Sequence, residues 1–407
     1  MAAATGVNYE WAARYPEVGT KPLPVTPYIS PEYFEAERQR VFRRCWLIVG
    51  RVDEAEKPGD FFVRDMPPLD TSALVVRGDD GKLRAFHNMC KHRGNQVAAT
   101  PRGNACEAGF PCLFHGWTYD TQGRLAYVPD EQFFVGLDRS RTGLMPMACE
   151  VWEGFVFVHS DPAPSQPLTD FIGEIRTTYD GYFSTMKRVS GYQFDMNINW
   201  KVFIDVSVEG CHAAYVHGNN IARQFTGTEN PFLHLPSKRL YKLHRTVSIP
   251  ADLSREPRPL EGLSHKYNAA TSYTPTQAKN TAEGLPPGVN PDRVPSWAFD
   301  ILSLFPNMVM LTAKGTYITM TFWPLSVNRT RVDVVFYMDP AKTLGERVGQ
   351  EYTIAMMRDV IREDADTLEP VQRGLESGAL TEIPFSDEEI ACRHFYLTVD
   401  RMVKNGK

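Results

Sequence analysis

Two short stretches, CKHRG at residues 90–94 and CLFHGW at residues 112–117, decide the expected fold. Each places one cysteine and one histidine close together, with a glycine just behind the histidine. Structural zinc sites commonly pair cysteine with cysteine and histidine with histidine, whereas both pairs here are mixed. Two mixed pairs suit a [2Fe–2S] cluster in which two thiolates bind one iron and two imidazoles bind the other. The sequence therefore predicts a [2Fe–2S] cluster, with structural zinc as the alternative, bound by Cys90, His92, Cys112 and His115.

Composition limits the other possibilities. The chain has 407 residues, of which 43% are hydrophobic, and this length allows two or three domains. A net charge of -5 and a pI of about 6.1 predict no basic surface for nucleic acid. The seven cysteines are an odd number spread over a long chain, as in proteins of a reducing compartment. No secretory signal opens the chain, and no apolar run approaches the ~20 residues of a membrane-spanning helix. A cytoplasmic protein without membrane contact is therefore expected.

Three zones differ along the chain. Residues 1–44 include a helix expected to begin with an N-cap at Ser30 and Pro31 at the first helical position. Residues 45–162 alternate short β-rich runs with turn residues, which predicts an all-β domain. Residues 163–407 mix helical and strand patterns, which indicates a second, α+β domain.

Two parts of the second domain differ in pattern. Residues 218–297 lack periodicity and are rich in proline, glycine and asparagine, so long loops are expected there. Residues 304–338 are rich in β-formers and are expected to supply central strands of a sheet.

A second group of ionisable residues lies at residues 197–220, NINWKVFIDVSVEGCHAAYVHGNN. If residues 200–213 are helical, then Asp205, Glu209 and His212 share one stripe of the helix. The neighbouring residues are apolar all round, so the helix is expected to be buried. Buried acids and histidines need partners or a metal.

His217 follows His212 by five residues, about 140° around a regular helix. The two can converge only where the helix ends or bulges, as helices often do at functional sites. Two histidines and one carboxylate form the triad that binds non-haem iron(II) and leaves positions open for dioxygen.

The carboxylate is expected from a helix near the C-terminus, within residues 352–375. Asp364 lies on the apolar stripe of this helix, an unusual place for an acid without a cation. It is therefore predicted to be the third ligand, and a buried salt bridge is the alternative. Glu363 and Asp366 point away from that stripe and are expected to be solvent-exposed.

Together these stretches resemble the catalytic α subunits of the Rieske non-haem iron oxygenases, of the aromatic ring-hydroxylating type. The resemblance covers nearly the whole chain, because four separate stretches occur in the family's order. They are CKHRG with CLFHGW, Asn199-Trp200-Lys201, Glu209-x2-His212-x4-His217, and Glu363-Asp364 before Val371-Gln372-Arg373-Gly374.

The resemblance implies an α+β protein: an all-β Rieske [2Fe–2S] domain at 45–162 and a catalytic domain at 163–407 whose antiparallel sheet is covered by helices. Residues 1–44 would pack on the catalytic domain. The implied ligands of a mononuclear Fe(II) are His212, His217 and Asp364.

Glu209 matches the acid that, in the family, bridges the cluster of one subunit to the iron of its neighbour in a trimer. Asp205 is the next candidate for that catalytic role. Many members have Glu-Asn where this chain has Asp205-Val206. The bridging residue is glutamate here, as in several amine-demethylating members, and not the aspartate usual in ring dioxygenases.

The implied activity is hydroxylation of an aromatic or other hydrophobic substrate, with O₂ and with electrons from NADH or NADPH. The electrons would arrive through a separate reductase, with or without a ferredoxin, because no nucleotide-binding glycine motif follows a strand here. The alternative is monooxygenation leading to N- or O-dealkylation of an aromatic amide, amine or ether. A Rieske electron carrier without oxygenase activity is the remote alternative, and it leaves the buried triad unexplained. With 407 residues, the chain resembles the family members that work as α-only trimers more than the longer ones paired with β subunits, so the resemblance implies a homotrimer.

Overall fold

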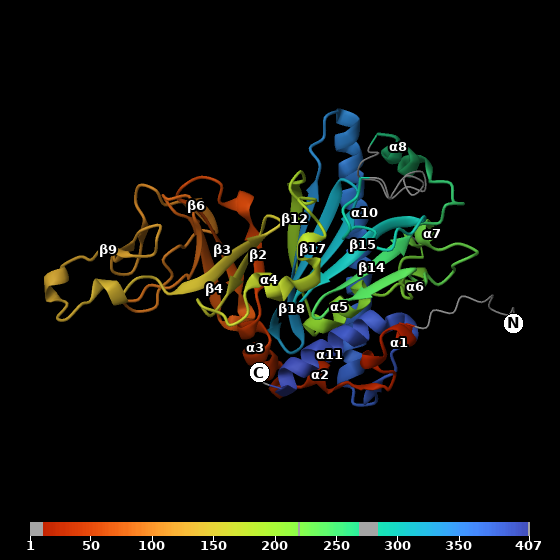
Figure 1. Cartoon of the computed structure of the whole chain (residues 1–407), viewed down its shortest axis with the longest axis horizontal. Coiled ribbons are helices and arrows are strands. Elements are labelled where there is room, and N and C mark those ends of the chain that lie inside the picture. The colour runs from red at the N-terminus through yellow and green to blue at the C-terminus, as the bar shows by residue number, and fades with distance from the viewer. Residues whose placement is uncertain (1–10, 219, 268–283, 406–407) are drawn as a thin grey trace. The chain divides into compact units, whose positions relative to one another are not determined.

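The computed structural model describes residues 11–218, 220–267 and 284–405 (Figure 1). The chain divides into two compact units, each described here by itself. One unit comprises Met1–Glu37 with Ile172–Lys407, and the other comprises Arg38–Phe171. Within the described residues, no helix is long and apolar enough to cross a membrane.

The helix predicted after Ser30 is present as α3, Pro31–Arg40. The Ser30 Oγ accepts a hydrogen bond from the backbone N–H of Tyr33 at 3.1 Å, so Ser30 caps the first turn as predicted. The helix ends at Arg40, and a 3-10 turn at Phe42–Arg44 follows it.

Arg38–Phe171 is an all-β unit built on a seven-stranded sheet of order β2-β11-β10-β5-β4-β3-β6, in which every pair is antiparallel. The strands of this sheet are β2 (Leu47–Arg51), β3 (Asp60–Met66), β4 (Thr71–Arg77), β5 (Leu83–His87), β6 (Arg102–Asn104), β10 (Pro146–Trp152) and β11 (Phe155–His159). A smaller sheet contains β7 (Phe110–Pro111), β8 (Thr118–Tyr119) and β9 (Leu125–Tyr127). This confirms the predicted all-β character.

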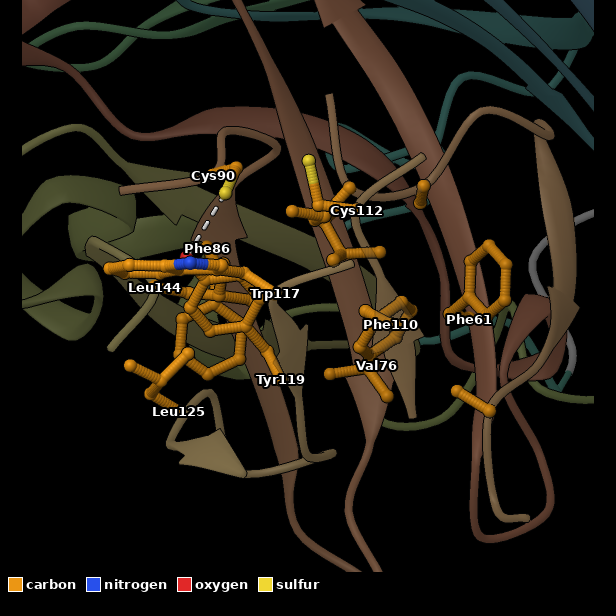
Figure 2. Packing of buried hydrophobic residues seen from close by; sticks show 14 of the residues in the cluster. Phe61, Val76, Phe86, Cys90, Phe110, Cys112, Trp117, Tyr119, Leu125 and Leu144 are labelled. Carbon is orange, nitrogen blue, oxygen red and sulfur yellow. Dashed lines mark hydrogen bonds between the residues drawn. The ribbon is translucent and has the colours of Figure 1, made fainter. Parts of the chain in front are cut away.

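The core of the β unit lies between these sheets and includes Phe61, Leu74, Val76, Phe86, Phe110, Trp117, Tyr119 and Leu125. Figure 2 shows Cys90 and Cys112 at the upper edge of this cluster. The loop after β5 carries Cys90, and the loop between β7 and β8 carries Cys112. Cys90 thus lies shortly after the end of β5, and Cys112 directly follows β7.

The other unit contains a second seven-stranded antiparallel sheet of order β12-β18-β17-β16-β15-β14-β13. Its strands are β12 (Lys187–Met196), β13 (Ser237–Leu240), β14 (Arg245–Pro250), β15 (Trp297–Leu304), β16 (Met308–Ala313), β17 (Thr316–Ser326) and β18 (Arg329–Met338). Residues 304–338 thus supply neighbouring strands of the sheet, as predicted.

The expectation of long loops across 218–297 is wrong in part. Strands β13 and β14 lie within this range and extend the sheet. The two strands have only four and six residues, and patterns this short are difficult to recognise among the surrounding turn residues. Residues 219 and 268–283 of the range lie outside the described residues.

Four helices position the residues of the second predicted site. They are α5 (Trp200–Ser207), α6 (Ala213–Val216), α10 (Leu344–Glu376) and α11 (Ile390–Asn405). Helix α5 packs against β17, α10 and α11, and α10 also contacts α6 (Figure 1). Helix α10 begins with a capping box at Thr343 and Glu346, which satisfies free N–H groups of its first turn. The protein is thus α+β, with helices against an antiparallel sheet, as predicted.

Candidate metal centres

The two loops that carry the cysteine–histidine pairs close in the same way. The N–H of Gly94 donates to the carbonyl of Cys90 at 2.9 Å, and the N–H of Gly116 donates to the carbonyl of Cys112 at 2.8 Å. Both glycines have positive φ, 80° for Gly94 and 72° for Gly116, a conformation that side chains with a Cβ disfavour. Two matching turns therefore present one thiol and one imidazole each.

The two imidazoles of these loops lie next to each other. The ring centroids of His92 and His115 are 4.6 Å apart, and His92 stacks on Trp117 at 4.9 Å. The Nδ1 atoms of both histidines are buried and have no hydrogen-bond partner among the described residues. Because buried polar atoms are nearly always satisfied, two such atoms side by side fit a metal-ligand role.

The thiols receive polar support from the protein. The Tyr119 hydroxyl lies 3.3 Å from the Cys90 Sγ (Figure 2), and the Asn95 Nδ2 donates to the Cys112 Sγ at 3.7 Å. Hydrogen bonds to cluster sulfurs are one of the ways in which a protein tunes the potential of an iron–sulfur centre. Burial, with the nearby charges of His115 and Arg93, lowers the pKa of His92, which favours the neutral imidazole that binds metal.

A single zinc ion fits these loops poorly. The ligand atoms of a tetrahedral zinc site lie ~2.0–2.3 Å from the ion, so they lie close to one another. Among the described residues, the ligand atoms of Cys90, His92, Cys112 and His115 do not all lie within 4.8 Å of one another. A two-iron cluster separates its cysteine iron from its histidine iron, and so does not require such a group.

The second predicted site begins where helix α5 stops. Helix α5 ends at Ser207, and Val208 follows it with non-helical dihedral angles. The prediction that Asp205, Glu209 and His212 share one helical stripe is therefore wrong. His212 instead precedes the short helix α6, and His217 follows it. The predicted helix end between the histidines is present, because α6 stops at Val216 and His217 is no longer helical. A second break, between α5 and α6, lies before His212 and was not predicted.

The structure brings His212, His217 and Asp364 together. Their ligand atoms all lie within 4.8 Å of one another. The Asp364 Oδ1 is 3.6 Å from the His212 Nε2 and 3.1 Å from the His217 Nε2. The same oxygen is buried without a hydrogen-bond partner among the described residues. Two ring nitrogens and one unsatisfied carboxylate oxygen that converge on one point form a donor set suited to Fe(II).

Each histidine of this triad is held at its other nitrogen by a glutamate. The His212 Nδ1 is bonded to Glu209, which also accepts from the backbone N–H of Cys211 and His212. The His217 Nδ1 is bonded to the Glu363 Oε2 at 2.8 Å. These carboxylates select the tautomer in which Nδ1 carries the proton and Nε2 is free to bind a metal.

The expectation that Glu363 points to solvent is therefore wrong in part. Its side chain is 31% exposed, but it reaches His217, which is only 4% exposed. Helix geometry alone placed Glu363 away from the apolar stripe of α10. A missed signal was available, since metal-binding histidines nearly always donate their other N–H to an acceptor. Tyr119 and Asn95 were likewise missed, because nothing local in the sequence relates them to the cysteines.

The charges around the triad favour a cation. Burial would lower the pKa of His212, but the hydrogen bond to Glu209 and the nearby Asp364 carboxylate together raise it. The site thus attracts positive charge more strongly than burial repels it. A divalent ion between the Nε2 atoms and Asp364 would supply that charge without a proton on Nε2.

Asp205 is not brought to this group. Its Oδ2 accepts a hydrogen bond from the Tyr28 hydroxyl at 2.6 Å, and its buried Oδ1 has no partner among the residues that the structure describes. Among the described residues, no histidine bonds to its carboxylate. The salt bridge of Lys201 with Glu37, 2.6 Å long, lies near it in the same buried network.

Two family matches cover most of the chain. Residues 45–135 match the Rieske [2Fe-2S] domain, and residues 183–405, more than half the chain, match the ring hydroxylating alpha subunit (catalytic domain).

Individual relatives are similar over most of their length. Choline monooxygenase of Spinacia oleracea is 26% identical over 91% of this chain and 75% of its own. The 2-aminobenzenesulfonate 2,3-dioxygenase alpha subunit of Alcaligenes sp. is 28% identical over 83% of this chain and 75% of its own. Among solved structures, a quaternary ammonium Rieske monooxygenase superposes with a TM-score of 0.74 at 19% identity, covering 97% of this chain and 99% of that one.

Fold, paired loops and matches together define a Rieske-type non-haem iron oxygenase, an oxidoreductase. The chain belongs to the ring hydroxylating alpha subunit family. It combines a Rieske [2Fe–2S] domain with a catalytic domain of the mononuclear non-haem iron type. A separate reductase is the typical electron donor of this family.

Proposed function

We propose that this chain hydroxylates a small organic substrate at an iron held by His212, His217 and Asp364, with electrons from a cluster held by Cys90, His92, Cys112 and His115. One observation carries the proposal. The Asp364 Oδ1 is buried and has no hydrogen-bond partner in the described part of the chain. It lies 3.1 Å and 3.6 Å from two histidine Nε2 atoms whose Nδ1 atoms are bonded to glutamates.

When bound, the cluster supplies electrons one at a time, and the iron supplies open coordination positions for dioxygen. The protein's own side chains do the rest. Glu209 and Glu363 hold the two imidazoles in one tautomer. Asp364 provides one negative charge against two neutral rings, so a bound Fe(II) keeps residual positive charge.

Glu209 is the proposed path for the electrons. Its Oε1 binds the His212 ring and its Oε2 accepts backbone N–H groups, so the side chain is fixed at a metal-binding histidine. We propose that it also meets a cluster histidine of an adjacent copy in a homotrimer. Inter-subunit electron transfer is described for the quaternary ammonium monooxygenase that shares this fold, and this supports the proposal.

Two substrate classes are candidates. The first is an aromatic or other hydrophobic compound that is hydroxylated on its ring. The similarity to the alpha subunit of 2-aminobenzenesulfonate 2,3-dioxygenase supports this class. The second is hydroxylation of a carbon next to a nitrogen or oxygen, which ends in N- or O-dealkylation. A quaternary ammonium compound is a further candidate for monooxygenation, since choline monooxygenase is similar over 91% of the chain.

The test is turnover of the purified protein with a surrogate reductase, NADH and O₂. The panel pairs arenes with aryl ethers, N-alkyl amides, choline and carnitine, and mass spectrometry in ¹⁸O₂ identifies the products. A cis-diol with two labelled oxygens supports ring dioxygenation. One labelled oxygen, or loss of an alkyl group as an aldehyde, supports monooxygenation. Protein that carries both metal centres and consumes electrons without oxygenating any class of compound contradicts the proposal.

A further inference from the structure

The contact between Glu363 and His217 is the least expected feature of the site. His217 is 4% exposed, and among the described residues its Nδ1 has one hydrogen-bond partner, the Glu363 Oε2 at 2.8 Å. Its Nε2 lies 3.1 Å from the Asp364 Oδ1. Two consecutive residues of helix α10, Glu363 and Asp364, therefore lie next to the two ring nitrogens of His217.

The two glutamates that hold the triad differ in their surroundings. Glu209 is buried, with 9% of its side chain exposed, and it accepts three hydrogen bonds, two of them from backbone N–H groups. The Glu363 side chain is 31% exposed and, among the described residues, is bonded to His217 alone. Glu209 is thus tied to the backbone of its own turn, whereas Glu363 acts on one ring.

We infer that Glu363 is a positioning residue that sets the affinity of the triad for its metal ion. It accepts the Nδ1 proton of His217, so Nε2 keeps its lone pair and points toward Asp364. A carboxylate at this place also increases the basicity of the imidazole as a ligand. The inference rests on the proposed function, since it takes His217 and Asp364 as iron ligands.

Removal of the acceptor has a defined physical consequence. In Glu363→Ala the buried Nδ1–H loses its partner, which favours the other tautomer or a rotated ring. In Glu363→Gln the amide oxygen still accepts the hydrogen bond, but the negative charge is gone. The alanine variant should therefore bind metal more weakly than the glutamine variant, and both more weakly than the wild type.

The experiment measures metal affinity directly and does not depend on turnover. Protein with an intact cluster is stripped of its mononuclear iron by a chelator under anaerobic conditions and titrated with Co(II). The dissociation constant comes from chelator competition and from the ligand-field bands of bound Co(II). Loss of a group that holds a metal-bound histidine typically weakens metal binding about 10–100-fold, and we expect this loss for Glu363→Ala.

Two controls separate positioning from a general structural effect. Asp366→Asn changes an acid on the same helix whose side chain is 73% exposed and pairs with Arg362 at 3.7 Å, and it should bind Co(II) like the wild type. Added formate should recover part of the affinity of Glu363→Ala, because the vacated position is partly open to solvent. Formate should not strengthen binding to the wild type. Circular dichroism and thermal unfolding of every variant report correct folding of the unit that contains Glu363.

The outcomes are distinct. Co(II) binding by Glu363→Ala and Glu363→Gln within twofold of the wild type overturns the inference and leaves the proposed function intact. Weakened binding without formate rescue and with an equal loss in Asp366→Asn also overturns it. Wild-type protein that takes up no Co(II) or Fe(II) at His212, His217 and Asp364 refutes the proposed site, and the inference with it.

Discussion

The two candidate centres use histidine in opposite ways. At the paired loops, the Nδ1 atoms of His92 and His115 are buried without a partner among the described residues. At the triad, the Nδ1 atoms of His212 and His217 are bonded to glutamates, and their Nε2 atoms lie within 3.6 Å of Asp364. The surrounding acceptors therefore decide which ring nitrogen is available to a metal.

This difference shows how one chain can keep two iron centres apart. The loops offer two sulfur and two nitrogen atoms and no carboxylate, a set that suits an iron–sulfur cluster. The triad offers two nitrogens and one oxygen, a set that suits a mononuclear ion with open positions. If the comparison holds, each centre can be removed without loss of the other.

The largest effect is expected for Cys112→Ser. A hydroxyl does not replace a soft thiolate, so the visible bands of the cluster should disappear, with about two of three irons per subunit. NADH-coupled activity should be abolished, while Co(II) binding at the triad should persist. Absorbance and iron analysis check this.

The matched control is Cys106→Ser. Cys106 is exposed, and its thiol donates to the carbonyl of Pro58. It should keep the colour and iron of the wild type. Unchanged colour in Cys112→Ser, with zinc found by elemental analysis, would end the Rieske assignment of these loops.

The second prediction removes the other centre. Asp364→Ala and His212→Ala should each lower total iron by about one of three per subunit and leave the cluster spectrum intact, because loss of a ligand acts locally. Activity should fall to background. Iron analysis combined with absorbance measures both centres in one sample.

Asp366→Ala is the control for helix α10, since its side chain is 73% exposed. It should retain all iron. If Asp364→Ala keeps full iron and activity, another acid is the third ligand, and the comparison between the centres fails.

The third prediction tests the link between the centres. Glu209→Gln keeps the shape of the side chain and removes its charge, so both centres should load. Reduction of the cluster should proceed near the wild-type rate. Reoxidation in the presence of substrate and O₂ should slow by about 10–100-fold, the range typical for groups that hold metal ligands. Rapid-mixing absorbance at the cluster bands follows both steps.

Glu229→Gln serves as the control, because Glu229 is an exposed acid in the loop after α7 (Ala222–Phe225). It should reoxidise at the wild-type rate. Normal reoxidation in Glu209→Gln would place the electron path elsewhere.

The sequence predicted one centre more completely than the other, for a physical reason. The first centre is formed by two short turns that contain Cys90, His92, Cys112 and His115. The spacing of these residues in the sequence is therefore enough to predict that each turn presents one thiol and one imidazole. The all-β unit around them followed from its alternating strands and turns. The triad depends on where the helical segment after residue 200 ends, and on which face of α10 packs against the histidines. Both are properties of tertiary packing.

The errors near the triad have the same origin. A regular helix over 200–213 placed Asp205 on one stripe with His212, but the chain leaves the helix at Ser207. Glu363 was expected in solvent because the apolar periodicity of a helix indicates only which residues face the core. It does not indicate which polar residues bind a buried side chain such as the His217 ring. Strand β14 escaped notice because it has only six residues, too few for a clear pattern among the surrounding turn residues.

The smallest effect concerns Asp205, whose carboxylate accepts a hydrogen bond from Tyr28 and, among the described residues, bonds to no histidine. Burial raises the pKa of its carboxyl group from 3.8 to about 7, against the opposing hydrogen bond from Tyr28 and the charge of Lys201. Between these pH values the folded chain keeps a proton that the unfolded chain has released. The folded state then binds more protons, so the free energy of unfolding falls as pH rises from about 4 to about 7.

Asp205→Asn should remove this dependence, because an amide accepts from Tyr28 without titrating. A single proton contributes at most about 1.4 kcal/mol per pH unit. The free energy of unfolding of the variant, relative to that of the wild type, should therefore rise between pH 5 and pH 7. The rise should be no steeper than about 1.4 kcal/mol per pH unit, and the difference should level off above pH 7. Thermal unfolding followed by circular dichroism at each pH gives the difference. A constant difference across this range would mean that Asp205 is already ionised in the folded protein, with Lys201 and Arg245 compensating its charge more strongly than burial opposes it.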